Sequence, residues 1–277
     1  MNKSIILLAS FLFWLTACQS DVPSSHTLKL KGSESMYETF LELKTDFEKI
    51  QDTIKVTLEG GGSRTGLMAI ESHSADIGLS SFPFDLTETL GTGHNVSEQV
   101  VAYDAIVLIT NQHNPITALS DEQVQAIYTG KTYDWEQLGG EKGLISPLIR
   151  DENSGTQRFF EDHFAVHELA KTAEVVDHNS EIVAKVSGNK HCIGFIGFAY
   201  FTESVHNLLL HTKDSTPEGS YVAPTHRNLK NGSYPLKRGL RVYFRQGDDP
   251  AVDAFLKYLQ TDRAHMIIES YGLIAAK

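Results

Sequence analysis

Apolar positions along this chain recur with two periods that alternate from one segment to the next. Between residues 36 and 50 they return every three or four residues, which predicts an amphipathic helix, and Ser33 and Ser35 stand just before it as possible caps. Over residues 54–58 they alternate one by one, as in a strand, and glycines 60–62 end the segment. The first part of the chain is therefore predicted to alternate between helix and strand.

The alternation continues to the end of the chain. Strand-like runs occupy residues 76–79, 145–149 and 240–244. The long apolar run 100–109 has the composition of a strand buried on both faces, the kind found in parallel sheets. Residues 120–123 fit a capping box ahead of a further helix. Strands and helices in alternation predict an α/β architecture.

The first residues do not follow this pattern. Lys3 precedes an apolar run over residues 5–15, which is shorter than the roughly twenty residues that a membrane-spanning helix needs. We therefore interpret residues 1–17 as a signal peptide that is removed, with a transmembrane anchor as the alternative. The run Leu15-Thr16-Ala17-Cys18 resembles a bacterial lipobox, in which Cys18 becomes the acylated first residue of the mature protein. Residues 18–27 are polar and are predicted to form a flexible, lipidated tether.

Length and charge narrow the class of protein. The 277 residues carry a formal net charge of −11, which disfavours nucleic acid and anionic membrane as partners because both require a basic surface. An acidic protein can still bind an anion when hydrogen-bond donors are concentrated at one site. With Cys18 acylated, Cys192 is the remaining thiol, and its apolar neighbours predict a small buried side chain rather than a nucleophile. The mature length allows one large domain or two modest ones without a disulfide.

Three short loops rich in Ser, Thr and Gly each lie between a strand-like segment and a predicted helix: residues 32–35, 60–66 and 153–156. Such a loop can present backbone N–H groups and hydroxyls at a helix N-terminus, where the helix dipole favours an anion. Any one of them could be no more than a capped turn. Together, and with Arg150 four residues before Ser154, they predict a shared site for an oxyanion.

The sequence lacks the common catalytic patterns. No pair of histidines flanks a glutamate in a metal-binding spacing, and no Gly-x-Ser-x-Gly turn occurs. His163 and His167 have helical spacing and could hold a metal, but such a pair is more typical of a solvated helix face. Gly155-Thr156 lacks the lysine and the longer glycine frame of a nucleotide-binding loop. The sequence therefore predicts a binding protein without catalytic residues, cofactor or metal, and not an enzyme.

Several motifs resemble, in order, those of the phosphate-binding proteins of bacterial ABC phosphate transporters. They are residues 32–36 (GSESM), 59–66 (EGGGSRTG), 75–81 (ADIGLSS), 127–131 (IYTGK) with Trp135, 150–156 (RDENSGT), 193–195, 234–236 and 272–274. Each motif is weak alone, whereas their order and spacing over nearly the whole mature chain are specific.

The resemblance implies a two-lobe periplasmic binding protein-like fold (type II), with the ligand cleft between the lobes. The chain would cross from one lobe to the other near residues 100–111 and 234–244. We therefore assign residues 28–105 and 240–277 to lobe 1 and residues 106–239 to lobe 2.

The resemblance further implies an extracytoplasmic solute-binding lipoprotein that captures inorganic phosphate for an ABC importer. Its protein partners would be the permease subunits of that importer. It would be a monomer in the periplasm or at the cell surface, held to the membrane by its lipid anchor alone. The alternative is an oxyanion-binding sensory or adhesion module of the same fold that is not coupled to a permease.

Carried over position by position, the resemblance implies these phosphate-binding residues: Glu34, Ser35, Ser63, Ser81, Arg150, Ser154, Gly155 and Thr156. Arg150 would bind phosphate in a bidentate manner, and hydroxyls and backbone N–H groups would provide the remaining hydrogen bonds. Glu34 stands where many members have Thr; its carboxylate would repel a dianion but could accept the proton of a monoprotonated phosphate. In the stretch Ser80-Ser81 the family often continues with Arg or uses Asp, whereas here Phe82 follows. Arg64 either supplies the missing positive charge or is exposed to solvent.

Overall fold

The computed structural model describes residues 26–211, 221–247 and 249–276. The signal peptide, the lipidation of Cys18 and most of the predicted tether lie outside the described residues. At its far end the tether prediction is wrong by two residues, because His26 and Thr27 already belong to the first strand, β1 (His26–Gly32), and pair with the strand that follows it in sequence.

One large, twisted sheet runs through the molecule. Its strands lie in the order β2 (Ile54–Glu59), β1, β3 (Ile77–Ser80), β12 (Lys237–Arg245), β4 (Val96–Asn111), β8 (Cys192–Gly197), β6 (Ser146–Ile149) and β7 (Glu174–Val175), with β9 (Val205–Asn207) and β13 (Ile274–Ala275) also paired to β4. A smaller sheet has the order β11 (Tyr221–Val222), β10 (Leu209–His211) and β5 (Ala118–Ser120).

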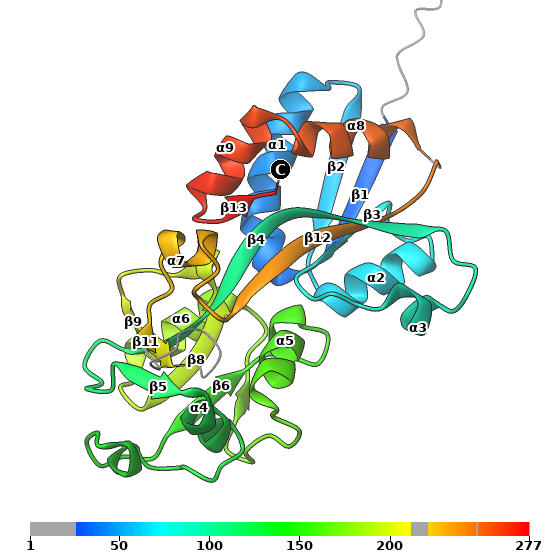
Figure 1. Cartoon of the computed structure of the whole chain (residues 1–277). Helices are drawn as coiled ribbons and strands as arrows, with labels where there is room; N and C mark the ends of the chain where they lie inside the picture. Colours follow the sequence, from blue (N-terminus) through cyan, green and yellow to red (C-terminus); the bar gives the residue numbers. More distant parts are fainter. Residues whose placement is uncertain (1–25, 212–220, 248, 277) are drawn as a thin grey trace, which may run out of the picture.

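Helices cover both ends of the large sheet (Figure 1). They are α1 (Tyr37–Ile50), α2 (Ser63–Glu71), α3 (Leu86–Leu90), α4 (Asp121–Tyr128), α5 (Gly155–Phe164), α6 (Asn179–Gly188), α7 (His226–Lys230), α8 (Pro250–Leu259) and α9 (Asp262–Ser270), with 3-10 turns at Glu34–Met36, Trp135–Leu138 and Phe198–Tyr200. The predicted capping box is present at α4, where Ser120 and Gln123 satisfy each other's backbone N–H groups. In the described ranges no helix is both long and apolar enough to cross a lipid bilayer.

The long strands β4 and β12 lie side by side where the two halves of the molecule meet (Figure 1). The first part of β4 pairs with β12 and its second part with β8, antiparallel in both cases. The prediction of a parallel-sheet strand at residues 100–109 is therefore wrong. The run is apolar for another reason: Ile106 and Leu108 enter one hydrophobic cluster, while Val107 and Ile109 enter a second cluster on the opposite face.

Two lobes, each with its own main core, meet along these strands. In one lobe the rings of Phe47 and Phe255 pack edge to face, with centroids 5.0 Å apart, between α1 and α8. In the other, Phe160 stacks on Phe195 at 4.0 Å. Along β4 the membership changes from the first core at Ala102 to the second at Ala105. The change from one core to the other thus falls within a continuous strand rather than at a loop.

Asp46 joins the helices that cover the first lobe. This buried carboxylate of α1 accepts hydrogen bonds from the hydroxyl of Tyr258 on α8 (2.9 Å) and from Nε of Arg263 on α9 (2.6 Å). The bond from Arg263 is the largest cause that holds the pKa of Asp46 below its ordinary value, and burial opposes it. The ionised form is therefore the one that holds these helices together.

We expect Asp46→Asn to lower the free energy of unfolding at pH 7 by about 1–2 kcal/mol, because the charge-assisted bonds are lost. The pKa of the folded state is depressed, so this contribution is fully present above the unfolded-state pKa, about 3.9, and is lost as the pH falls through the lower folded-state value. Urea unfolding of both proteins at several pH values measures the difference. A gap between them that does not narrow in acid would contradict the assignment.

Candidate anion-binding site

The loops predicted to share a site come together between the lobes. The hydroxyls of Ser35 and Thr156, from opposite lobes, lie 2.8 Å apart. On the side of the first lobe, Ser33 donates a hydrogen bond to Ser81 (3.0 Å), and Ser63 lies 3.3 Å from Ser81. All five side chains belong to buried residues. Hydroxyl groups from four separate segments of the chain therefore meet in one buried polar region.

The N-termini of two helices lie at the same buried hydroxyls. Helix α2 begins at Ser63 directly after Gly62, whose φ of +90° is one that L side chains rarely adopt. Helix α5 begins at Gly155 after Ser154, which caps it by accepting a bond from the backbone N–H of Gln157 at 3.3 Å. A Cβ on Gly155 would lie 2.2 Å from the hydroxyl of Ser63, so glycine is required for the two N-termini to approach each other. Both helix dipoles favour an anion here.

Arg150, which follows the end of β6 (Ser146–Ile149), is buried with part of its donor capacity unused. Its Nη2 donates to the carbonyl of Asp177 at 2.6 Å, while Nε and Nη1 have no hydrogen-bond partner among the described residues. Burial lowers the pKa of Arg150, with the carboxylate of Asp151, 3.7 Å from Nη2, opposing that shift. Arginine nevertheless stays charged in proteins. Buried donors of this kind require an acceptor, and an oxyanion with several oxygens supplies it.

A second buried arginine was not anticipated from the sequence. Arg238 of β12 bonds Asp104 of β4 through Nε (3.1 Å) and Nη2 (2.7 Å), and it also donates to Thr156 and Ser35 at 2.9 and 3.0 Å. Burial raises the pKa of Asp104 and the neighbouring guanidinium opposes that rise. A usable signal was present: Asp104 is a lone charge inside the apolar run 100–109, and a charge in a buried strand needs a partner.

Glu34 lies beside the buried hydroxyls, and its carboxylate contacts Gly61 and His178. Its carboxylate accepts the N–H of Gly61 at 2.9 Å and lies 3.3 Å from Nδ1 of His178, which belongs to the opposite lobe. Tyr200, also from that lobe, donates to the backbone carbonyl of Glu34 at 2.6 Å. Arg64 is exposed to solvent, which is one of the two alternatives left open for it.

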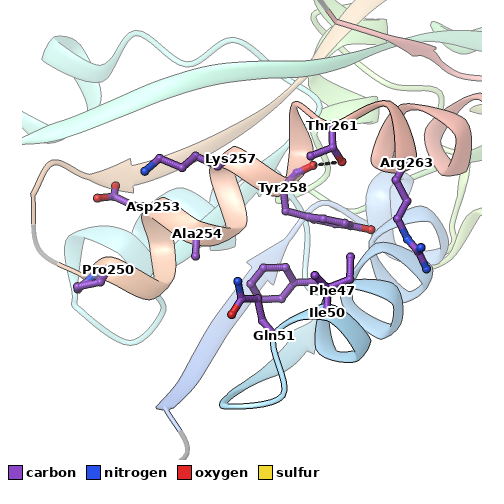
Figure 2. Close-up of a pocket in the computed structure, with 10 residues that line it drawn as sticks. All are labelled: Phe47, Ile50, Gln51, Pro250, Asp253, Ala254, Lys257, Tyr258, Thr261 and Arg263. Carbon is purple, nitrogen blue, oxygen red and sulfur yellow. Dashed lines mark hydrogen bonds between the residues drawn. The ribbon is translucent and has the colours of Figure 1, made fainter.

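A mainly apolar cavity of about 520 Å³ lies elsewhere, between α1 and α8 (Figure 2). Apolar pockets are the usual first candidates for ligand sites. In this one Phe47 and Tyr258 lie against each other, with ring centroids 5.3 Å apart, and the guanidinium at its edge belongs to Arg263, which already pairs with Asp46. Lys257 also lines this cavity, whereas the cluster of hydroxyls and buried Arg150 lie between the lobes.

Two lobes that enclose hydroxyls, helix N-termini and a buried guanidinium define a binding protein for a small anion. The chain belongs to the PBP superfamily, whose domain model matches residues 19–263.

Relatives and solved structures agree with this class. The chain is similar to the phosphate-binding protein PstS of Borreliella burgdorferi, with 28% identity over 288 residues and full coverage of both proteins. A phosphate-bound substrate-binding protein of the phosphate ABC transporter type from Clostridium perfringens has a TM-score of 0.83 and 25% identity, covering 91% of this chain and 100% of that one. An ABC-type phosphate transport receptor from Vibrio cholerae has a TM-score of 0.74 and 26% identity, covering 89% and 99%. The resemblance to phosphate-binding proteins of ABC transporters is confirmed, and these relatives are named as binding proteins or as a transport receptor rather than as enzymes.

We expect Arg150→Ala to weaken phosphate binding by about 2–5 kcal/mol, because the main charged donor of a desolvated contact is removed. Isothermal titration calorimetry of the folded variant measures this loss. Arg227→Ala, which removes an exposed arginine of α7, is the matched control and should bind phosphate as the wild type does. Unchanged affinity in the Arg150 variant would remove this residue from the site.

Glu34→Gln should change the preference between phosphate and sulfate by no more than about twofold. The reason is geometric: the carboxylate is bonded to Gly61 and faces His178, and a glutamine keeps an oxygen for the N–H of Gly61. Competition titrations of both proteins near pH 7.5 give the ratio. A shift toward sulfate of about tenfold or more would instead show that the carboxylate accepts the proton of phosphate.

Proposed function

We propose that this protein captures inorganic phosphate outside the cytoplasm and delivers it to an ABC importer. The observation that carries the proposal is that Nε and Nη1 of buried Arg150 have no partner among the described residues, near a cluster of hydroxyls and the N-termini of α2 and α5. The relatives named as phosphate-binding proteins, and the phosphate-bound structure from Clostridium perfringens, support phosphate as the ligand.

In this proposal the ligand is held by the residues carried over from the resemblance. Arg150 supplies two N–H donors, Ser35, Ser63, Ser81, Ser154 and Thr156 supply hydroxyls, and the backbone at Gly155 supplies an N–H at the start of α5. Hydroxyl groups can donate or accept, so they suit an anion that carries protons on some of its oxygens. Glu34 contributes through its place in the first loop, next to Ser35, and its carboxylate joins the lobes at His178.

Capture follows from closure of the lobes. We propose residues 28–105 and 240–277 as lobe 1 and residues 106–239 as lobe 2, with β4 and β12 as the two connections. The changes of core membership at Ala102 and Ala105 support these boundaries. Closure brings Ser35 to Thr156 and removes the anion from water, which strengthens each charge-assisted hydrogen bond to it.

The proposal also includes a membrane anchor and a protein partner. Acylation of Cys18 would anchor a monomer to a membrane in the periplasm or at the cell surface, and permease subunits of the importer would receive the phosphate. The lipobox-like run ending at Cys18 supports the anchor, and the transport names of the relatives support the permease.

Calorimetry on the mature, unlipidated protein tests the function. The protein is freed of bound anion by unfolding and refolding, then titrated separately with phosphate, arsenate, sulfate and molybdate. We expect phosphate to bind at one site per chain, with arsenate next because its shape and protonation are similar. If phosphate gives no heat of binding and does not stabilise the protein, the proposal is overturned. Tighter binding of sulfate or molybdate than of phosphate would assign the site to a different oxyanion.

A further inference from the structure

Asp104 and Arg238 form a buried ion pair between the two strands that connect the lobes. They are directly opposite each other in the pairing of β4 with β12, and each side chain is 1% exposed. The pair lies where the polypeptide passes from one core to the other, between Ala102 and Ala105 along β4. It therefore belongs to the connection itself rather than to either lobe.

Arg238 uses its donors on protein atoms. A guanidinium has five N–H groups. Nε and Nη2 of Arg238 bond Asp104, Nη1 bonds the hydroxyl oxygen of Thr156, and Nη2 also bonds that of Ser35. Arg150 is the opposite case, because its Nε and Nη1 have no partner in the described part of the chain. Arg150 and Arg238 therefore differ in role: Arg150 has donors for a ligand, and Arg238 joins protein groups to one another.

The bonds from Arg238 also determine where the hydroxyl protons of Ser35 and Thr156 point. Each hydroxyl has one proton, and a guanidinium cannot accept it. The two oxygens lie 2.8 Å apart, and a single proton fills the space between them. The other proton must point away from Arg238 and from the partner oxygen. One of these two hydroxyls is thereby kept as a donor for an anion.

The same side chain bridges the lobes. Ser35 belongs to the 3-10 turn Glu34–Met36 of the first lobe, whereas Thr156 belongs to α5 of the second. When the lobes separate, Arg238 cannot remain bonded to both hydroxyls. The N–H of Phe198 holds the other carboxylate oxygen of Asp104 at 3.0 Å, so the base of the bridge stays fixed while the lobes move.

We infer that Arg238, oriented by Asp104, is a positioning residue that couples closure of the lobes to capture of the anion. It does so by holding the hydroxyls of Ser35 and Thr156 together and by keeping one of them as a donor. The inference rests on the proposed function for the identity of the anion, whereas the bridge itself consists of protein atoms only.

Three proteins test this inference beside the wild type. Arg238→Lys keeps the charge beside Asp104, but an ammonium on a flexible stem cannot span both hydroxyls with fixed geometry. The double variant Asp104→Leu with Arg238→Met replaces the pair by apolar side chains, so no unpaired charge is left buried if the lysine variant fails to fold. Arg263→Lys is the matched control, because it alters an Arg–Asp pair that lies within the first lobe.

Phosphate titration calorimetry and small-angle X-ray scattering, with and without phosphate, are the measurements. We expect both Arg238 variants to bind phosphate about tenfold more weakly or worse and to have larger radii of gyration than the wild type under the same conditions. Arg263→Lys should match the wild type in both. Arg238 variants with the affinity and the radii of gyration of the wild type would overturn the inference. The inference would also be overturned if these variants were less thermally stable but unchanged in affinity and radius.

If the proposed function is wrong, these measurements give a different pattern of results. In that case the wild type itself does not bind phosphate, and the ligand-free scattering still decides the bridge. A larger radius for the Arg238 variants than for the wild type and Arg263→Lys supports it, and equal radii overturn it.

Discussion

Buried positive charge is the constraint on which the site and the arrangement of the lobes both depend. An arginine cannot lose its proton at ordinary pH, and a buried donor left without a partner costs about 1–3 kcal/mol. Nε and Nη1 of Arg150 are two such nitrogens, without a partner among the residues that the structure describes. An anion with several acceptor oxygens can satisfy these donors, which ties the position of Arg150 to the binding of the ligand.

The fold supplies this site by joining elements that belong to different lobes. Helices α2 and α5 begin in opposite lobes, and their N-termini approach closely only because Gly155 has no side chain to collide with Ser63. The long strands β4 and β12 let one hydrogen-bonded sheet continue from lobe to lobe. A continuous sheet can bend at its crossing while its backbone hydrogen bonds are kept, which suits the closure proposed for the lobes.

What the sequence could predict was local. Glycines and hydroxyls between a strand and a helix indicate an anion-binding turn by themselves, so the loops around Ser35, Ser63 and Ser154 were found. The partnership of Asp104 with Arg238 was missed, because it depends on the register of two strands whose residues are 134 positions apart. The prediction of a parallel sheet at residues 100–109 was wrong for a related reason. An apolar run indicates burial on both faces of a strand, and in β4 that burial comes from two hydrophobic cores rather than from parallel neighbouring strands.

The binding of an anion by a chain of net charge −11 follows from how the acids near the site are engaged. Asp104 is paired with Arg238, Asp151 lies beside Arg150, and the carboxylate of Glu34 accepts the N–H of Gly61 and faces His178. Each of these carboxylates therefore has its own partner and is less able to repel a ligand. The remaining negative charge is distributed over a surface where water and salt screen it within about 10 Å. The local field is then dominated by Arg150 and the two helix N-termini, which is why the summed charge of the protein does not decide what it binds.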